Sequence, residues 1–336
     1  MAMRAADHAP PPRLVDSFGR RVTYLRVSVT DRCDFRCRYC MAEAMSFLPR
    51  RELLTLEELA LIVDAFVDRG VTKVRLTGGE PLVRRGLPEL AHRIGRRIGD
   101  GLNELTLTTN GARLTEAAEE LAAAGIRRIN VSLDTLDRAR FAHIARRDAF
   151  DDVMAGIAAA KAVGLAIKIN MVALKGLNDD EFVGMAEWCG GQGFDLSIIE
   201  TMPLGVIEDD RTDRFLPLTF VREQLARRFT LTPSDRRTGG PSRYVFAKEL
   251  GTHIGFISPL THNFCETCNR VRLTAEGRLY LCLGQSASVD LKAALRGGGV
   301  GALDAALDEA MRIKPKAHDF HIGTPAVSRH MSVTGG

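Results

Sequence analysis

Apolar and polar residues alternate along six short segments in the first two hundred residues, and stretches with helical periodicity lie between them. Alternation with a period of two is typical of strands, because successive side chains of a strand point to opposite faces. The predicted strands are residues 24–29, 73–77, 104–108, 128–133, 166–172 and 194–200. The predicted helices are residues 56–69, 87–98, 116–124, 151–163 and 179–189. This repeated strand–helix pattern predicts a parallel sheet with right-handed crossovers.

The two faces of these predicted strands differ in polarity. One face is apolar and carries Leu25, Val27, Val29, Val74, Leu76, Leu105, Leu107, Ile129, Val131, Ile167 and Ile169. The other is polar and carries Arg26, Ser28, Thr30, Lys73, Arg75, Thr77, Thr106, Thr108, Asn130, Ser132, Lys168 and Asn170. A sheet covered by helices on both faces would be apolar on both. The pattern therefore favours an incomplete α/β barrel with a polar lumen suited to an anion. The alternative is that these polar residues are strand ends near solvent.

The pattern changes after residue 200. A predicted helix at 218–229 precedes a polar, Gly-rich stretch at 234–242, short strands at 243–247 and 253–257, a cysteine-bearing segment at 259–284 and a Gly-interrupted helical region at 288–311. We expect a flexible lead-in over residues 1–20, a partial barrel over 21–210, an α+β extension over 211–325 and a tail over 326–336.

Composition narrows the class of protein. Of the 336 residues, 45% are hydrophobic and 26% charged, which excludes a disordered chain, a collagen and a disulfide-dense mini-protein. No apolar run approaches the ~20 residues of a membrane span, and a net charge of +4 does not argue for a nucleic-acid polymer or a membrane surface as partner. Residues 1–12 contain no apolar stretch typical of a secretion signal. With seven cysteines, we therefore expect a reducing, cytoplasmic location.

Three cysteines follow the first predicted strand closely. Cys33, Cys37 and Cys40 form the pattern C-x3-C-x2-C. Three thiolates can hold three irons of a 4Fe–4S cluster and leave the fourth iron with an open coordination position. A zinc site would need a fourth ligand, and no histidine or cysteine follows within twenty residues.

A second group of three cysteines lies in the C-terminal part. Cys265, Cys268 and Cys282 form the pattern C-x2-C-x13-C. His262 precedes the pair, so spacing alone leaves a Cys3His zinc site and an iron–sulfur cluster nearly equal. An electron-transfer or zinc-binding scaffold without chemistry of its own also remains open at this point.

The first cysteine motif, with an aromatic residue before its last cysteine, resembles the radical S-adenosylmethionine (SAM) superfamily. Gly78-Gly79-Glu80-Pro81 at the end of the second predicted strand resembles that superfamily's GGEP motif. The resemblance implies an incomplete (β/α)6 barrel and a cluster whose open iron chelates SAM. It further implies that electron transfer to SAM releases a 5′-deoxyadenosyl radical. The implied SAM-pocket residues are Tyr39, Gly79, Glu80, Ser132 and Met202.

The segment Cys268-Asn-Arg-Val-Arg-Leu273, the later Leu-Cys282-Leu and the terminal Gly-Gly resemble the GTP 3′,8-cyclase family of molybdenum cofactor biosynthesis. This resemblance runs from about Leu14 to the last glycine. It implies a second 4Fe–4S cluster at Cys265, Cys268 and Cys282, whose open iron binds guanine. The implied GTP contacts are Arg26, Arg75, Thr108, Lys168, Arg270, Val271 and Arg272.

The same resemblance implies that the tail with Gly335 and Gly336 enters the active-site cavity. A terminal Gly-Gly by itself would more often be a disordered end. Thr334 departs from the isoleucine expected there, which affects the packing of the tail.

The implied reaction begins with abstraction of H3′ from GTP by the 5′-deoxyadenosyl radical. Addition of C3′ to C8 then gives (8S)-3′,8-cyclo-7,8-dihydroguanosine 5′-triphosphate, the first step of molybdenum cofactor biosynthesis. The implied partners are a reductant or electron-donor protein, a downstream cyclic pyranopterin monophosphate synthase and a second copy of the chain in a homodimer. A radical SAM peptide-maturing enzyme is the nearest alternative, but the C-N-R-x-R segment, the Gly-Gly tail and the lack of cysteines beyond Cys282 disfavour it.

Overall fold

One sheet organises the chain in the computed structural model, which describes residues 13–208, 211–323 and 326–335. The strands of its N-terminal half are β1 (Tyr24–Ser28), β2 (Lys73–Thr77), β3 (Glu104–Thr109), β4 (Arg128–Ser132), β5 (Ala166–Ala173) and β6 (Asp195–Glu200). They pair in parallel in this order. All six predicted strands are therefore confirmed, with ends that differ by at most one residue.

The C-terminal half extends this sheet at both edges. Its strands are β7 (Leu231–Pro233), β8 (Arg243–Ala247), β9 (Thr252–Ile257), β10 (Arg270–Leu273), β11 (Arg278–Tyr280) and β12 (Ser288–Asp290). The order across the sheet is β12-β11-β10-β1-β2-β3-β4-β5-β6-β9-β8-β7. Strand β10 joins β1 in parallel, and β9 joins β6 in parallel. The second group of cysteines is thereby brought beside the first strand.

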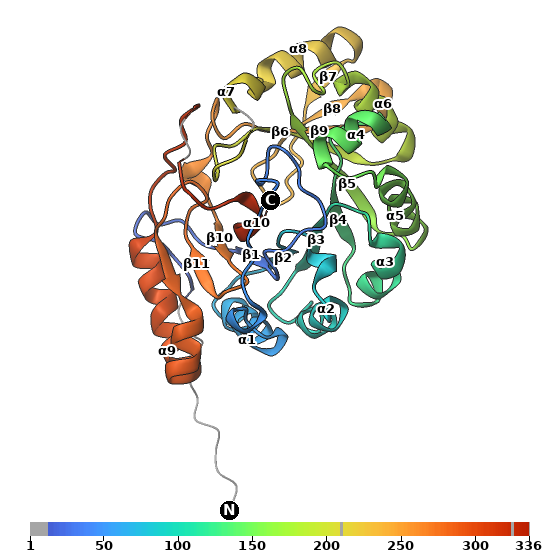
Figure 1. The fold of residues 1–336 in the computed structure, drawn as a ribbon. Helices are drawn as coiled ribbons and strands as arrows, with labels where there is room; N and C mark the ends of the chain where they lie inside the picture. Colours follow the sequence, from blue (N-terminus) through green and yellow to red (C-terminus); the bar gives the residue numbers. More distant parts are fainter. Residues whose placement is uncertain (1–12, 209–210, 324–325, 336) are drawn as a thin grey trace, which may run out of the picture.

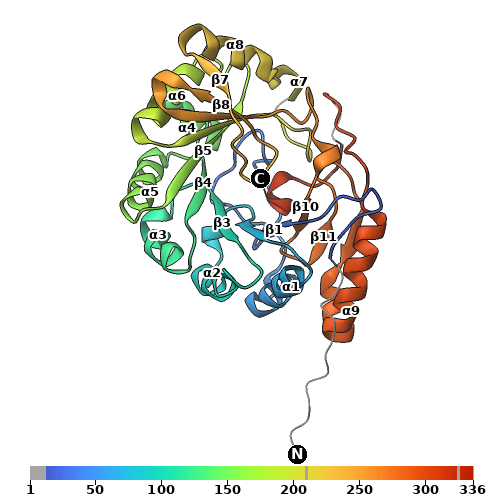
Figure 2. The same cartoon turned by 180° about the vertical axis from the view of Figure 1, so that it is seen from behind.

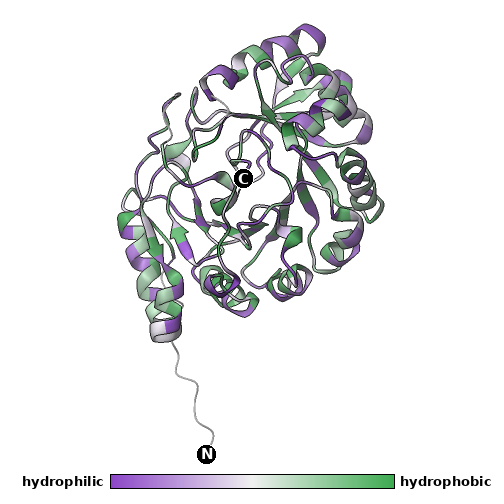
Figure 3. Cartoon of the chain, in the orientation of Figure 1, coloured by the Kyte–Doolittle hydropathy of each residue, from purple (hydrophilic) through white to green (hydrophobic). Residues whose placement is uncertain are grey.

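Nine α-helices lie around the outside of the strands in the described part of the chain (Figure 1). They are α1 (Leu56–Asp68), α2 (Leu87–Gly95), α3 (Leu114–Ala123), α4 (Arg138–Ala145), α5 (Phe150–Ala162), α6 (Phe182–Gln192), α7 (Arg211–Arg214), α8 (Leu218–Arg228) and α9 (Leu291–Ile313). A short helix near the C-terminus, α10 (Met331–Thr334), lies inside the ring of strands. The larger helices at the rim mix hydrophilic and hydrophobic residues (Figure 3), and their apolar side chains join those of the sheet in the main core. No helix among the described residues is long and apolar enough to cross a membrane.

Helix α1 illustrates how local sequence sets an element. Thr55 and Glu58 form a capping box, in which the Glu58 N–H donates to Thr55 Oγ1 at 3.2 Å and the Thr55 N–H donates to Glu58 Oε2 at 2.8 Å. Leu59, Ile62 and Phe66 recur at helical spacing and are fully buried. The element is a helix because its first turn is satisfied and one face is apolar.

Residues 13–20 differ from the expected flexible lead-in. Leu14 is 1% exposed, and Val15 forms a bridge with Arg21. Arg20 donates to the carbonyl oxygens of Cys265 at 2.7 Å, Pro315 at 2.6 Å and Lys316 at 2.6 Å. The segment packs because its single leucine and one arginine reach core and backbone partners distant in sequence. The rest of that expectation, residues 1–12, lies outside the described residues.

The end of the chain lies inside the ring of strands. Helix α10 appears within the ring from both sides of the molecule (Figures 1 and 2). Ser332 and Thr334 are 2% and 1% exposed, and the helix contacts β1. The polar lumen predicted from the strand pattern is thus partly filled by the protein's own tail.

Candidate active site

A cavity lies in the lumen and is bordered by both halves of the chain. Its described lining residues are Tyr24, Arg26, Arg75, Asn130, Lys168, Asn170, Ile199, Met202, Thr238, Gly240, Pro241, Ser242, Ile257, Pro259, Phe264, Cys265, Cys268, Arg270, Arg272, Cys282, Leu283, His318, Phe320, Met331 and Gly335. Five of these are arginine or lysine, and none of these described residues is aspartate or glutamate. The cavity therefore favours an anionic ligand.

Strand register explains why the arginines meet. Arg26 of β1 lies opposite Arg75 of β2 on one side and Arg272 of β10 on the other. The Nε atoms of Arg270 and Arg272 are buried without a hydrogen-bond partner among the described residues. An oxyanion can satisfy such guanidinium groups. The unpartnered Nε atoms of Arg270 and Arg272 therefore fit a ligand with negatively charged oxygens.

Tyr24 lies among these cations. Arg75 Nε donates to Tyr24 Oη at 2.5 Å, and Arg75 Nη1 donates to Thr108 Oγ1 at 2.8 Å. Burial alone would raise the pKa of Tyr24, but Arg75, Arg26 and Lys73 lower it to about 7. A phenol that loses its proton near neutral pH shows how strongly positive the surrounding potential is.

Lys168 is 4% exposed and donates to Tyr244 Oη at 3.2 Å. Burial, followed by Arg75 and Arg128, lowers its pKa to about 7. Burial likewise lowers the pKa of Arg26 to about 9. A bound anion would reverse these shifts, because it stabilises the charged forms.

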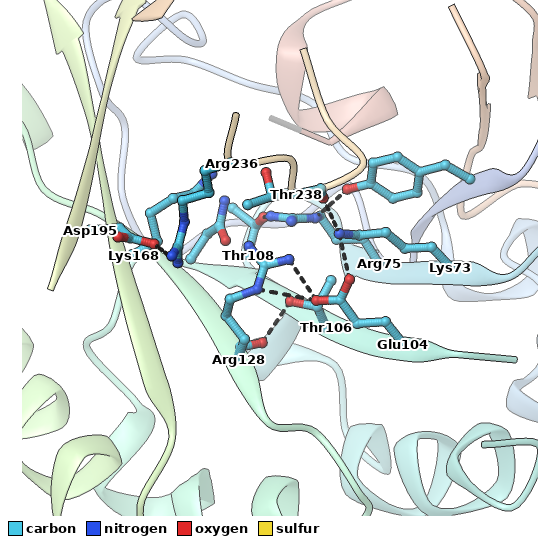
Figure 4. Close-up of polar contacts among 12 residues, drawn as sticks. Lys73, Arg75, Glu104, Thr106, Thr108, Arg128, Lys168, Asp195, Arg236 and Thr238 are labelled. Carbon is cyan, nitrogen blue, oxygen red and sulfur yellow. Dashed lines mark hydrogen bonds and ion pairs between the residues drawn. The ribbon is translucent and has the colours of Figure 1, made fainter. Parts of the chain in front are cut away.

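Charge declines along the lumen from the amino ends of the strands to their carboxyl ends. Lys73 and Arg128 open β2 and β4, and Glu104 at the start of β3 contacts both, with Lys73 Nζ and Arg128 Nη2 each 2.6 Å from one of its carboxylate oxygens (Figure 4). The last lumen-facing residues of the same strands are neutral: Thr77, Thr108 and Ser132. The anionic part of a ligand therefore belongs at the amino side, and neutral groups at the carboxyl side.

All three cysteines of the second group line the cavity. Burial would raise the pKa of Cys268, but Arg270 and Lys314 lower it to about 7, and Lys314 Nζ lies 3.8 Å from its sulfur. A thiol held near its thiolate form fits a metal-cluster ligand. His262, the fourth ligand of the zinc alternative, is exposed and is not among the described lining residues.

The first group of cysteines lies on the loop that follows β1. Burial raises the pKa of Cys33 and Cys37 above their usual range and that of Cys40 to about 11. Coordination to iron deprotonates such thiols, and three sulfurs on one half-buried loop fit a 4Fe–4S cluster with one open position. Across the described residues, no group of three or more His, Cys, Asp or Glu side chains is arranged to hold a single metal ion.

Gly79 packs directly against this cysteine loop. A Cβ at position 79 would overlap the carbonyl oxygen of Arg32, and the Glu80 N–H donates to that same oxygen at 2.8 Å. The strand end after β2 therefore approaches the cysteines only because residue 79 lacks a side chain.

The Glu80 carboxylate accepts three hydrogen bonds from its own chain. Its oxygens accept from the Leu82 N–H at 3.0 Å, Thr109 Oγ1 at 2.8 Å and the Asn110 N–H at 2.6 Å. Burial raises its pKa to about 7. The side chain thus ties the turn after β2 to the end of β3, and it leaves backbone groups of the turn to face a ligand.

The other expected SAM-pocket residues are distributed around the carboxyl ends. Tyr39 Oη donates to Asp134 Oδ2 at 2.8 Å, and Met202 lines the cavity. Ser132 is half-buried at the end of β4. Asp134 follows the end of β4, where the functional residues of barrels gather. Burial raises its pKa to about 6.

Two expected GTP contacts are not lining residues. Thr108 is buried and is occupied by Arg75, so it positions that arginine. Val271 points away from its neighbours Arg270 and Arg272 and is fully buried in the main core. Its side chain cannot reach the cavity, because alternate residues of β10 face opposite sides.

The tail reaches the cavity as expected. Gly335 is a lining residue and lies against Thr77 at the end of β2. The hydroxyls of Ser332 and Thr334 are buried without a hydrogen-bond partner in the described part of the chain. Gly336 lies outside the described residues.

Sequence reasoning missed several lining residues. Tyr24 shares the polar face of β1 with Arg26 and could have been found from that alternation. Thr238, Phe264 and His318 come from loops, and no periodic pattern marks them.

Comparison with known proteins assigns the chain to a family. Residues 27–189 match the family model "Radical SAM superfamily", and residues 194–320 match "Molybdenum Cofactor Synthesis C". The GTP 3′,8-cyclase of Erythrobacter litoralis is 61% identical over 96% of this chain and 98% of its own length. The GTP 3′,8-cyclase of Rhizobium etli is 58% identical over 99% of this chain and 96% of its own length.

Solved structures support the fold. Streptococcus suis SuiB matches with a TM-score of 0.59 at 16% identity, over 85% of this chain and 67% of that chain. SuiB bound to S-adenosylmethionine matches with a TM-score of 0.58 over 81% of this chain and 62% of that chain. The radical SAM barrel is thus confirmed, and by its full-length relatives the chain belongs to the GTP 3′,8-cyclase family, the radical SAM enzymes that cyclise GTP in molybdenum cofactor biosynthesis.

Proposed function

We propose that this cavity is where the chain performs the cyclisation of GTP that defines its family. The observation that carries the proposal is the meeting, in one lumen, of a second cysteine group with five cations. Three sulfurs with an open position can take a purine, and the cations can take its phosphates.

The two groups of cysteines take different roles in this proposal. Cys33, Cys37 and Cys40 hold the first 4Fe–4S cluster, and Cys265, Cys268 and Cys282 hold the second. When bound, the first cluster and SAM supply the 5′-deoxyadenosyl radical that removes the C3′ hydrogen of GTP. Tyr39, Gly79, Glu80, Ser132 and Met202 form the surroundings of SAM, Gly79 and Glu80 chiefly through the backbone of their turn.

The chain itself orients GTP. Arg26, Arg75, Lys168, Arg270 and Arg272 hold the triphosphate at the amino side of the lumen, where the cations lie. The base lies beside Cys268, near the start of β10. The ribose then points toward the neutral carboxyl side, where the loop of the first cysteines begins. Holding C3′ near C8 favours ring closure, because the two reacting atoms are already in position.

The tail supplies a further contact. Gly335, which lies against the last residue of β2, and Gly336 present backbone groups beside the ribose. Phe320 and Met331 line the same cavity and exclude water from it. A new bond forms between C3′ and C8, and addition of one electron and one proton then gives a product with the mass of GTP.

The proposal extends to location and partners. A cytoplasmic site agrees with seven free cysteines. SAM cleavage consumes an electron, which supports a reductant or electron-donor protein. The cyclised triphosphate requires a later enzyme, and the family resemblance supports a cyclic pyranopterin monophosphate synthase and a homodimer. We also propose the division near residue 210 between barrel and extension.

Anaerobic incubation with GTP, SAM and dithionite tests the proposal. Mass spectrometry should detect 5′-deoxyadenosine and a new nucleotide with the mass of GTP. Formation of 5′-deoxyadenosine without that nucleotide, in protein carrying about eight irons per chain for two clusters, would contradict it.

A further inference from the structure

A chain of hydrogen bonds crosses the amino side of the lumen and ends on Lys168. Lys168 Nζ donates to Tyr244 Oη at 3.2 Å, and Tyr244 Oη lies 3.1 Å from Thr238 Oγ1. When Lys168 is charged, its ammonium can only donate, so the Tyr244 oxygen accepts from it and is free to donate its own hydrogen to Thr238. The direction of the chain is therefore set by its first member.

The loop of residues 234–242, which we call the floor loop, contains Thr238. Lys73 Nζ donates to the Thr238 carbonyl oxygen at 2.5 Å, and Arg236 pairs with Asp195 of β6 (Figure 4). Thr238 is held from two sides, by Lys73 on its backbone and by Tyr244 on its hydroxyl. The floor loop is thus an anchor for Tyr244 and not merely its neighbour.

Tyr244 reaches the lumen from β8 only because β9 has a glycine beside it. Tyr244 pairs with Gly255, and a Cβ at position 255 would lie 2.9 Å from Tyr244 Cε1 and would overlap Ser242 Oγ. The ring occupies the space that a side chain at 255 would fill. This missing side chain lets a residue outside the predicted barrel touch a lysine of β5.

Lys168 needs such a partner. It is a long side chain among cations, and burial with neighbouring positive charge opposes its own charge. Besides Tyr244, the charged and titratable groups around it are Arg75, Arg128, Tyr24 and Lys73. Asp195 of β6 lies opposite Lys168 in the strand register, and its carboxylate is paired with Arg236. An oxygen acceptor directed at the ammonium favours the charged form and limits its rotamers.

We infer that Tyr244, anchored by Thr238, is a positioning residue that holds Lys168 charged and directed into the GTP cavity. The inference rests on the proposed function, in which Lys168 contacts the triphosphate. Tyr244 does not line the cavity among the described residues, so its effect on GTP passes through Lys168.

The test is a double-mutant cycle on the holoprotein with both clusters, with the GTP Kd measured anaerobically. Tyr244→Phe should weaken GTP binding about tenfold, the usual cost of losing a hydrogen bond to a charged group. Lys168→Met should weaken it further, and Tyr244→Phe added to Lys168→Met should change nothing more. Thr232→Val, which removes a hydroxyl from β7 at the far edge of the sheet, is the control and should bind GTP as wild type does. SAM affinity should stay constant throughout.

The pH dependence supplies a second readout. Losing the acceptor lowers the pKa of Lys168 from about 7, so the ammonium is lost at lower pH. The ratio of the Tyr244→Phe Kd to the wild-type Kd should therefore rise from pH 6 to pH 8. A tenfold effect of Tyr244→Phe that persists in the Lys168→Met background would overturn the inference and leave the GTP site intact. Wild-type GTP affinity of the Lys168→Met protein would instead show that Lys168 does not bind GTP, and it would overturn the inference as well.

Discussion

The charged residues that line the lumen carry an excess of positive charge, which an anionic ligand can neutralise. Five cations line the cavity, and the carboxylates of Glu104 and Asp195 are engaged in ion pairs at the amino side. Tyr24 partly compensates, because its phenol has a pKa of about 7 there. Concentrated positive charge of this kind costs stability in the free protein and is repaid when a polyphosphate binds.

Removing one of these charges should weaken the binding of GTP and leave the binding of SAM unchanged. Arg270→Ala or Arg272→Ala should cost about 2–5 kcal/mol of GTP binding, the usual loss when one partner of a desolvated charge pair is removed. Calorimetry with GTP and with SAM checks this, and SAM affinity should remain near wild type. Arg278→Ala, on the partly exposed side of β11, is the control and should affect neither. Equal losses for both ligands would indicate damage to the fold.

The two cysteine groups should separate two steps of the reaction. Replacing Cys33, Cys37 or Cys40 by Ala should abolish SAM cleavage, because these residues hold the cluster that receives SAM. Replacing Cys265, Cys268 or Cys282 by Ala should leave some uncoupled 5′-deoxyadenosine formation and remove the cyclised nucleotide.

Cys189→Ala is the control for this pair of experiments. Its thiol is buried in the core between helix and sheet and belongs to neither group. Iron content should fall by about four per chain for either group and stay unchanged for Cys189→Ala. Normal cyclisation by Cys268→Ala would contradict guanine binding at the second group.

At the scale of elements, short turns hold the residues of the site, and glycines allow the backbones of neighbouring turns to approach each other closely. The turn from β2 to the short 3₁₀ helix η2 (Pro81–Val83) touches the cysteine loop through Gly79. Gly79→Ala should destabilise the protein by about 1–3 kcal/mol, because backbone must move to admit a Cβ. Denaturation and the electron paramagnetic signal of the first cluster should both report it.

Gly184→Ala is the matched control for the turn. Gly184 lies inside α6 with nothing within 4 Å of its added Cβ. Alanine there should stabilise the helix by about 0.5–1 kcal/mol and leave the cluster signal unchanged. A Gly79→Ala protein as stable as wild type would show that the cysteine loop can shift freely.

The tail is the second element whose loss should be selective. Deleting Gly335 and Gly336 should barely change stability, both clusters or GTP affinity. Product formation at saturating GTP and SAM should fall a hundredfold or more, because one backbone donor to developing charge is worth about 2.7–4 kcal/mol. A bulky residue added after Gly336 should act like the deletion. Full turnover by the shortened protein would mean that the tail is idle.

Regular elements were the part of this molecule that sequence patterns could predict. Strict alternation identified β1 to β6, and the capping box at Thr55 identified the start of α1. Helix α4 escaped because its eight residues bury only Phe141, Ile144 and Ala145, too few for a clear period.

The site was predictable in its chemistry and not in its geometry. Cysteine spacing and lumen-facing arginines are local patterns, whereas the pairing of Arg26 with Arg272 joins residues far apart in the chain. The Glu80 carboxylate accepts from the Asn110 N–H, and the Tyr244 ring lies over Gly255. Both orientations depend on residues distant in sequence, which no local pattern contains. Tertiary contacts decide such orientations.

For the whole molecule, the C-terminal half is part of the barrel wall. Strands β9 and β10 continue the parallel sheet, and Arg20 at the other end of the chain binds the backbone of Cys265. The cavity between the halves is therefore bounded by one continuous sheet, which holds the two cysteine groups at fixed separation. A fixed separation suits a reaction that begins at one cluster and binds its substrate at the other.

Helix α10 sits inside the ring of strands, and it is the last helix of the chain to be synthesised. Every strand and both cysteine groups therefore leave the ribosome before the element that fills the lumen. Assembly can follow the same order: iron–sulfur clusters enter an open ring, and the tail closes behind them. A chain shortened before α10 should consequently accept its clusters faster than one that carries this helix.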